Sequence, residues 1–106
     1  MLPVAGNITF KAAGYAAFTI HPTDGEPFAA SVTGRVRWAL ERLITAGETG
    51  CTPIKQPAPR WSGYIFELRQ LGVEVETLTE KHGGEYPGHH GRYVLRCKVT
   101  RERGDL

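Results

Sequence analysis

Long hydrophobic runs and cysteines are scarce in this chain of 106 residues. A membrane-spanning helix needs about 20 consecutive apolar residues, and no segment approaches that length. The first residues carry neither a basic leader nor an apolar segment, so no secretory signal is visible and we expect a cytoplasmic protein. Cys51 and Cys97 belong to no Cys-x-x-Cys pair, and a reducing compartment favours two free thiols over a disulfide.

The motifs of the common enzyme classes are also missing. No Gly-x-Ser-x-Gly, P-loop or dinucleotide-binding fingerprint occurs. A cysteine beside a histidine can act as a nucleophile and its base, but the sequence shows no third residue to orient such a pair and no oxyanion loop. We therefore expect that the protein is not an enzyme and needs no cofactor.

A standard metal site is missing as well. His82, His89 and His90 lie close together in the sequence, with Cys97 a few residues later. Three imidazoles can bind zinc, but this spacing fits no standard site. Adjacent histidines in a glycine-rich loop seldom both bind one ion, so we expect no metal.

A strong excess of one charge is the last absence. Thirteen basic and eleven acidic residues give a net charge of +2. This balance permits DNA binding but is weaker than the strongly basic balance that marks many DNA-binding domains. Charge alone therefore does not decide the function.

The chain has room for one domain, and its first 30 residues are rich in Gly, Ala and Pro. Two short strands are expected there, one around Ile8 and Phe10 and one over residues 16–20, joined by an Ala-Gly turn. Residues 21–27 are turn formers and predict a loop. We interpret residues 1–30 as an N-terminal extension that either extends the main sheet or pairs with a second copy.

The clearest helix of the sequence follows this extension. Ser31 or Thr33 can cap it, and Gly47 stands where a left-handed residue is needed to end it. Apolar residues recur on one face at helical spacing. They are Val36, Leu40, Leu43 and Ile44.

A second, shorter helix is expected before residue 58. Thr52 can cap it, and Pro53 suits its first turn, where the missing N–H costs nothing. Pro57 and Pro59 stop it after one or two turns. We expect it to pack on the core through Ile54.

The third helix and a hairpin complete the pattern. The helix begins near Pro59 or Arg60 and ends at Gly72, with a buried stripe of Trp61, Tyr64, Ile65, Leu68 and Leu71. Two strands follow, around a glycine-rich stretch at residues 81–91 that is predicted to be neither helix nor strand. We interpret that stretch as the wing, the segment between the two strands of the hairpin. Residues 101–106 are expected to be a frayed polar tail.

Several spaced motifs carry a resemblance. They are the helix at 35–47, Thr52-Pro53-Ile54, Arg60-Trp61-Ser62, the Ile65 to Thr77 stretch and Arg92-Tyr93-Val94-Leu95. Residues 33–96 resemble a family of small winged helix-turn-helix domains of bacteria, phages and prophages. The resemblance implies an α+β fold of three helices followed by a two-stranded β-hairpin wing, over residues 31–100. It also implies DNA binding in transcription or phage development.

In such a fold the start of the third helix enters the major groove, where arginine bonds bidentately to guanine. Arg60 is the first candidate for this contact, and its structural alternative is a residue that only caps or solvates the helix. The first helix would anchor phosphates, and the wing would reach the backbone or minor groove. The DNA-binding candidates are Arg60, Ser62, Gly63, Lys55, Gln56, Arg35, Arg37, Lys81, His89 and Arg92.

The alternative function is a protein-interaction module that keeps the fold without DNA affinity. The weak net charge, the acidic first strand of the hairpin and exposed aromatics such as Phe66 and Tyr86 favour it. A basic stripe from Arg35 through Arg60 to Arg92 would favour DNA, whereas an apolar patch of Phe66, Trp38 and Tyr15 would favour a protein partner. A homodimer through the N-terminal strands is expected if one module buries too little surface on DNA.

Overall fold

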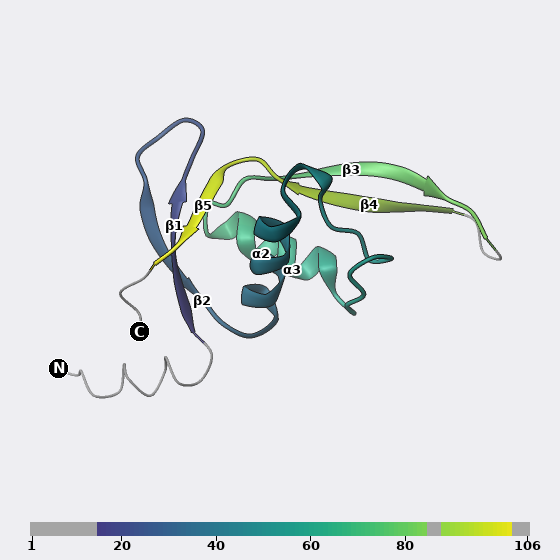
Figure 1. Cartoon of the computed structure of the whole chain (residues 1–106), viewed down its shortest axis with the longest axis horizontal. Helices are drawn as coiled ribbons and strands as arrows, with labels where there is room; N and C mark the ends of the chain where they lie inside the picture. Colours follow the sequence, from purple (N-terminus) through teal and green to yellow (C-terminus); the bar gives the residue numbers. More distant parts are fainter. Residues whose placement is uncertain (1–14, 85–87, 103–106) are drawn as a thin grey trace.

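The computed structural model describes residues 15–84 and 88–102 (Figure 1). Strands at the start of this part lead into two helices, and a long hairpin and a last short strand follow. The elements are β1 (Ala16–His21), β2 (Phe28–Val32), α2 (Gly34–Ala46), the 3-10 turn η1 (Gly47–Thr49), α3 (Trp61–Gln70), β3 (Val75–His82), β4 (Gly88–Leu95) and β5 (Lys98–Arg101).

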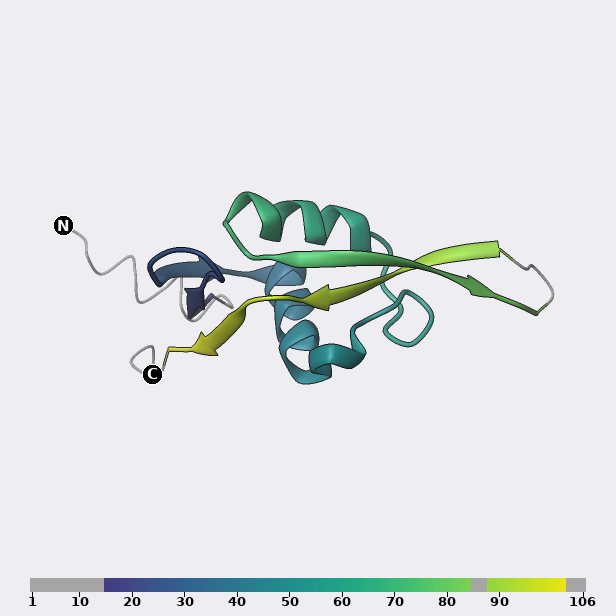
Figure 2. The ribbon, with the colours of Figure 1, turned by 90° about the horizontal axis from the view of Figure 1, so that it is seen from above.

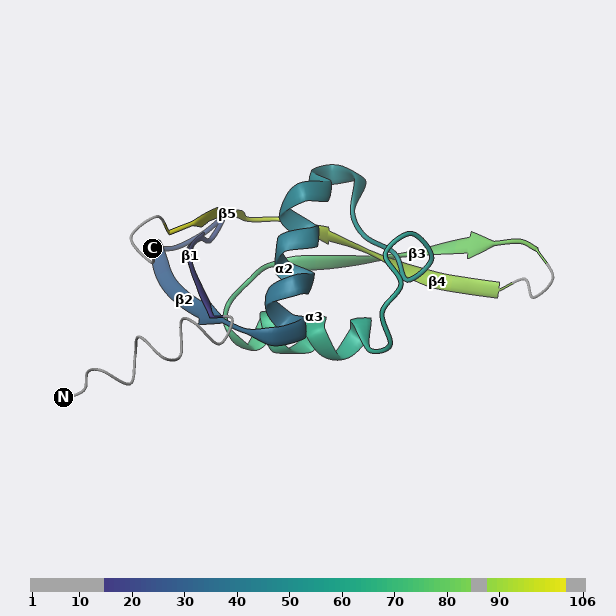
Figure 3. The ribbon, with the colours of Figure 1, turned by 60° about the horizontal axis from the view of Figure 1, so that its bottom comes forward.

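Two antiparallel sheets lie on either side of the helices. One has the strand order β2-β1-β5, and the other is the β3-β4 hairpin. Figure 2 shows α3 running alongside β3, and Figure 3 shows α2 crossing the base of the hairpin. In all three views the outer half of the hairpin extends beyond the helices, away from the three-stranded sheet.

Helix α2 forms where the sequence predicts it. Thr33 stands at the N-cap position, but the predicted capping hydrogen bond from its side chain is not formed. Gly47 follows the last turn with φ of 57° and donates its N–H to the carbonyl of Leu43. A left-handed glycine at this point is the usual way to end a helix. The buried face consists of Ala39, Leu40 and Leu43.

The expected second helix is reduced to a single turn. The Gln56 N–H bonds to the Thr52 carbonyl, and the Lys55 N–H bonds to Thr52 Oγ1, as in a capped helix start. The turn does not continue because Pro57 and Pro59 cannot extend it. The prediction of three helices is therefore not met in the described residues, where two α-helices are found. The prediction that Ile54 packs on the core is wrong, since its side chain is 57% exposed.

A backbone bridge before this turn was not anticipated from the sequence. Cys51 and Tyr93 exchange both backbone hydrogen bonds, at 2.9 and 2.8 Å. The segment after η1 thereby pairs with β4 as an isolated antiparallel bridge. Gly50 makes the approach possible, because a Cβ there would lie 2.8 Å from the Tyr93 carbonyl oxygen.

Helix α3 packs through an aromatic cluster. The Trp61 ring lies 5.4 Å from Trp38 of α2 and 5.6 Å from Tyr93 of β4, measured between centroids. Its indole N–H donates to the Gln56 carbonyl at 2.6 Å. The predicted buried stripe is confirmed except for Leu71, which is 40% exposed because it lies beyond the helix end at Gln70.

The wing strands are longer than the sequence suggests. β3 continues to His82 and β4 begins at Gly88, with Glu80 opposite His90 and Lys81 opposite His89. The prediction that residues 81–91 contain no strand is therefore wrong at both ends. Gly88 pairs with His82 and Gly91 with Thr79 in the antiparallel ladder, although glycine weakens strands on average.

The three-stranded sheet shares one core with the helices. Ala16, Phe18 and Ile20 of β1 are buried, as their alternation predicts, and Val32 and Val99 join them. β1 pairs with β2 through a hairpin over residues 22–27, and β2 was not predicted. The predicted strand at Ile8 and Phe10 lies outside the described residues.

The first two residues of the predicted polar tail, Arg101 and Glu102, are held in the fold. Arg101 belongs to β5, and the Glu102 N–H donates to the Ala17 carbonyl at 2.9 Å. The Thr19 hydroxyl also bonds to the Glu102 carboxylate. These contacts hold the end of the described chain on β1, so only residues 103–106 of the predicted tail stay untested.

Candidate nucleic-acid interface

The outward face of α3 carries small and polar residues and one carboxylate, Glu67, around one aromatic side chain. It lies opposite the buried face of Trp61, Tyr64, Ile65 and Leu68. Successive turns bring Ser62, Phe66 and Gln70 to the surface, and all three are exposed. Gly63 lies beside Ser62, so these two positions contribute little side-chain bulk of their own to the first turn. We call Ser62, Gly63, Phe66 and Gln70 the α3 ridge.

Arg60 stands at the start of the α3 ridge, at the N-cap position of the helix. Its guanidinium lies over Gly63, since a Cβ on Gly63 would be 3.6 Å from Arg60 Nε. Within the described part of the chain, Arg60 forms no ion pair with a carboxylate. Its charge is therefore available to an external anion.

Two more candidates lie on the single turn before α3. Lys55 is exposed and, like Arg60, has no acidic partner among residues 15–84 and 88–102. Gln56 is different, because its side-chain oxygen accepts the Thr52 N–H at 2.9 Å. This contact closes the turn, so Gln56 has a structural role in the protein as it stands.

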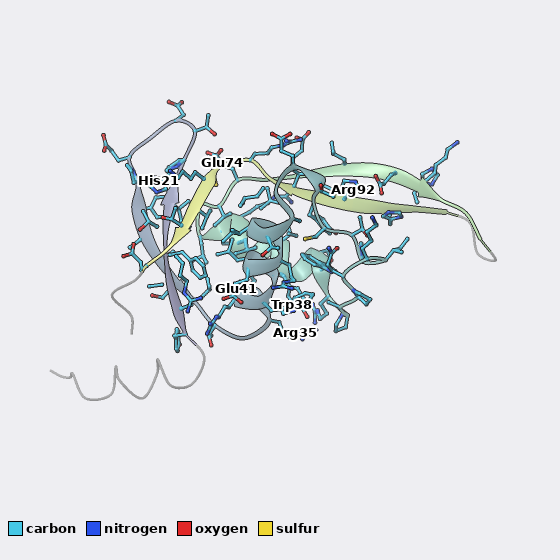
Figure 4. The ribbon with its side chains drawn as sticks, viewed as in Figure 1. His21, Arg35, Trp38, Glu41, Glu74 and Arg92 are labelled. Atoms are coloured by element: carbon cyan, nitrogen blue, oxygen red, sulfur yellow. The ribbon has the colours of Figure 1, made fainter. Side chains whose placement is uncertain are left out.

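Arg35 and Arg37, the two candidate arginines of α2, are already engaged within the molecule. The Arg35 guanidinium lies 5.0 Å from the centroid of the Trp38 ring, and its Nε donates to the Tyr64 hydroxyl at 3.3 Å. Arg37 pairs with Glu41 at 3.1 Å, one helical turn away. Figure 4 shows Arg35 and Trp38 together near one end of α2.

Strand alternation divides the wing candidates between two faces. Thr77 and Tyr93 are cross-strand partners on the face that contacts α3, through Arg69 and Trp61 respectively. Lys81 is four residues beyond Thr77, so it and its partner His89 point to that same face. Both side chains are exposed. The side chain of His82 lies outside the described part.

Arg92 belongs to the opposite face of the hairpin. It donates to both carboxylate oxygens of Glu80, at 2.7 and 2.8 Å, and to the Thr49 carbonyl at 2.6 Å. His90 contacts the same carboxylate at 3.0 Å. The hydrogen bonds from Arg92 and His90 hold the pKa of Glu80 below its ordinary value, with Arg92 the largest cause.

Neither the continuous basic stripe expected for DNA binding nor the apolar patch expected for a protein partner is found in the described residues. Figure 4 shows Arg92 on the wing, well separated from Arg35 on α2, and both are engaged internally. Trp38 packs against Trp61, while Tyr15 lines a groove with Val36 and Leu71. Phe66 takes part in neither group, and Tyr86 lies outside the described residues.

Other kinds of site are not found in the part of the chain that the structure describes. No three His, Cys, Asp or Glu side chains gather as metal ligands there. No described helix is long and apolar enough to cross a membrane. Cys51 and Cys97 are free thiols, and burial raises the pKa of each.

The comparison with protein families agrees with this architecture. A family model described as a winged helix domain matches residues 29–105. The chain belongs to the winged helix domain family. No curated protein and no solved structure matches it significantly.

The matched region of the winged helix domain begins within β2 and includes α2, α3, the β3-β4 wing and β5. The resemblance drawn from the sequence is thereby confirmed at the level of the family. Arg69, in the last turn of α3, connects the helix to the wing. Its guanidinium donates to the Val75 carbonyl at 3.1 and 2.7 Å and to Thr77 Oγ1 at 3.0 Å.

Proposed function

We propose that this winged helix domain binds duplex DNA and regulates transcription, in the manner of the small regulators of bacteria and phages that its sequence resembles. The observation that carries the proposal is the α3 ridge beside Arg60 and Lys55. A slim helical face flanked by cations without acidic partners suits the major groove, which admits an α-helix and is rich in hydrogen-bond acceptors.

In this proposal Arg60 makes the leading base contact. It lies at the start of α3, the part of a recognition helix that usually enters the groove. Its planar guanidinium can bond bidentately to O6 and N7 of guanine. Ser62 can donate to or accept from a base edge, and Gly63 lets the helix backbone approach closely once the Arg60 guanidinium, which lies over Gly63 in the free protein, turns to its base.

Lys55, Lys81 and His89 are the proposed phosphate contacts. The last two extend the α3 side of the molecule along the wing, so a duplex seated on α3 would pass beneath them. Arg35, Arg37 and Arg92 keep their internal partners in this proposal and position the elements that carry the interface. Gln56 likewise holds the turn before α3.

Fluorescence anisotropy of a labelled random-sequence duplex at low salt tests the proposal. We expect the wild-type protein to bind with an affinity that falls steeply as salt rises, and Arg60→Ala to weaken binding at every salt concentration. Lys98→Ala is the matched control, because Lys98 is an exposed cation of β5 at the other end of the molecule. Absence of wild-type binding at low salt would refute DNA binding.

A protein-interaction role is the second candidate, favoured by exposed Ile54 and Phe66 and by the internal pairing of several arginines. It would be supported if the wild-type protein failed to bind DNA and a purified partner protected α3 from hydrogen exchange.

Self-association is proposed through the three-stranded sheet. Within the described residues, β2 pairs with β1 on one edge, and its other edge has no strand partner. Such an edge can pair with another strand. Light scattering at increasing protein concentration would measure the dimer, and a constant monomer mass would refute it.

A further inference from the structure

Phe66 is the most exposed of the large apolar side chains in the described part of the chain, at 61%. It lies in the middle of α3, on the face opposite the buried stripe. Its burial on folding therefore cannot explain its presence, since the core is formed without it.

The neighbours of Phe66 on the helix surface are not apolar. One turn before it lie Ser62 and Gly63, and one turn after it lie Arg69 and Gln70. Phe66 is thus a single apolar side chain within a polar ridge. A protein-binding patch would normally be a contiguous apolar area of several side chains, and α3 does not present one.

Helix α3 holds Phe66 in a fixed position relative to the wing. Arg69, three residues later and on the adjoining side of the helix, is clamped to β3 by hydrogen bonds to the Val75 carbonyl and Thr77 Oγ1. On the far side, Trp61 and Tyr64 fasten the helix to α2 and β4. An exposed aromatic ring on such a rigid helix is well placed for selective contact.

We infer that Phe66 recognises thymine by packing against its 5-methyl group in the major groove. This inference rests on the proposed DNA binding of α3. The thymine methyl is the apolar group that the major-groove edges of the four bases present, and phenylalanine is one of the side chains that contact it. With Arg60 directed to guanine one and a half turns earlier, α3 selects sites in which a thymine lies a few base pairs from a guanine.

Replacement of thymine by deoxyuridine tests the inference, because it removes only the methyl group. Duplexes bound by the wild-type protein are first selected from a random library, and each thymine is then replaced in turn. We expect one position per bound module at which the wild-type affinity falls about four-fold, the effect of exposing one methyl group. Phe66→Ala should bind the thymine and deoxyuridine duplexes equally at that position.

Ile54→Ala is the matched control. Ile54 is almost as exposed as Phe66 but lies on the turn before α3 rather than on the ridge, and its variant should keep the full thymine preference. Because the Phe66 side chain lies outside the core, we expect Phe66→Ala to keep the wild-type circular dichroism and melting temperature. Phe66→Leu, which retains an apolar contact, should keep part of the preference.

The outcomes separate this inference from the proposed function. If the wild-type protein selects no duplex at all, DNA binding fails and the inference fails with it. If the protein binds DNA but no position prefers thymine to deoxyuridine, DNA binding stands and the role of Phe66 is refuted. A preference that survives in Phe66→Ala refutes it equally.

Discussion

Arg69 of α3 and Thr77 of β3 are joined by a hydrogen bond of 3.0 Å from the guanidinium Nη2 to the threonine hydroxyl. The same guanidinium also donates twice to the Val75 carbonyl. These hydrogen bonds fix the position of α3, the helix proposed to bind DNA, relative to β3 of the wing. A ligand that contacts both would meet them in a geometry fixed before binding, which lowers the entropy cost of association.

Arg69→Met should remove the hydrogen bonds between α3 and β3 and leave the packing of the core unchanged. Methionine keeps the apolar length of the side chain but donates no hydrogen bond, so we expect the free energy of unfolding to fall by about 1–2 kcal/mol. Amide hydrogen exchange in β3 should accelerate more than that in β1. Gln70→Met, at an exposed neighbouring position, should change stability by no more than about 0.5 kcal/mol. Equal effects of the two substitutions would contradict a clamp by Arg69.

The sequence predicted α2 and α3 well because their signals are local, whereas the expected second helix is a single turn. The apolar spacing before Gly47 and the left-handed glycine at the end of α2 each depend on a few neighbouring residues. β2 was missed because Phe28-Ala-Ala-Ser-Val offers little contrast between its two faces, and its strand character depends on pairing with β1. The Cys51–Tyr93 bridge was missed because it depends on pairing between residues far apart in the sequence, which no local pattern indicates.

The candidate site was harder to predict than the fold. Charge patterns identify arginines on the surface of a helix or strand, but they do not show which arginines are already paired. Arg35 stacks on Trp38, and Arg92 is bound by Glu80 from the opposite strand. Only the three-dimensional arrangement separates these residues from Arg60, which has no carboxylate partner in the described residues.

Gly72→Ala should destabilise the protein by about 3 kcal/mol. Gly72 has φ of 101°, and an added Cβ would lie 2.7 Å from Cζ of Phe28. A strained backbone and a steric clash therefore add together. Gly47→Ala, with φ of 57° and open space around the new Cβ, should show only the backbone cost of about 1–2 kcal/mol. Urea denaturation measures both.

The double substitution Phe28→Ala and Gly72→Ala separates the two causes. Removing the ring should relieve the clash, so the two changes together should cost less than the sum of the single changes. Strict additivity would show that Phe28 and Gly72 are not in contact.

The wing should lose stability in acid through Glu80. The hydrogen bonds from Arg92 and His90 lower the pKa of Glu80 in the folded protein, so the carboxylate stabilises the fold above its ordinary pKa of 4.5. That contribution is lost as the pH falls from 4.5 through the lower, folded pKa. Side-chain carboxyl NMR shifts should show the Glu80 midpoint below 4.5, and Arg92→Ala should move it upward. An unchanged midpoint in the variant would contradict the pairing.

The salt dependence of DNA binding should count the lysines that are proposed to contact phosphate. If Lys55 and Lys81 each contact a phosphate, the logarithm of the binding constant should fall with the logarithm of salt concentration with a slope of about −1.8, and alanine at either lysine should reduce its magnitude by about 0.9. Arg35→Ala should leave the slope unchanged, because its guanidinium is held by Trp38 and Tyr64. A smaller slope in Arg35→Ala would mean that a phosphate competes successfully with an aromatic ring and a hydroxyl, and the α2 surface would then belong to the interface.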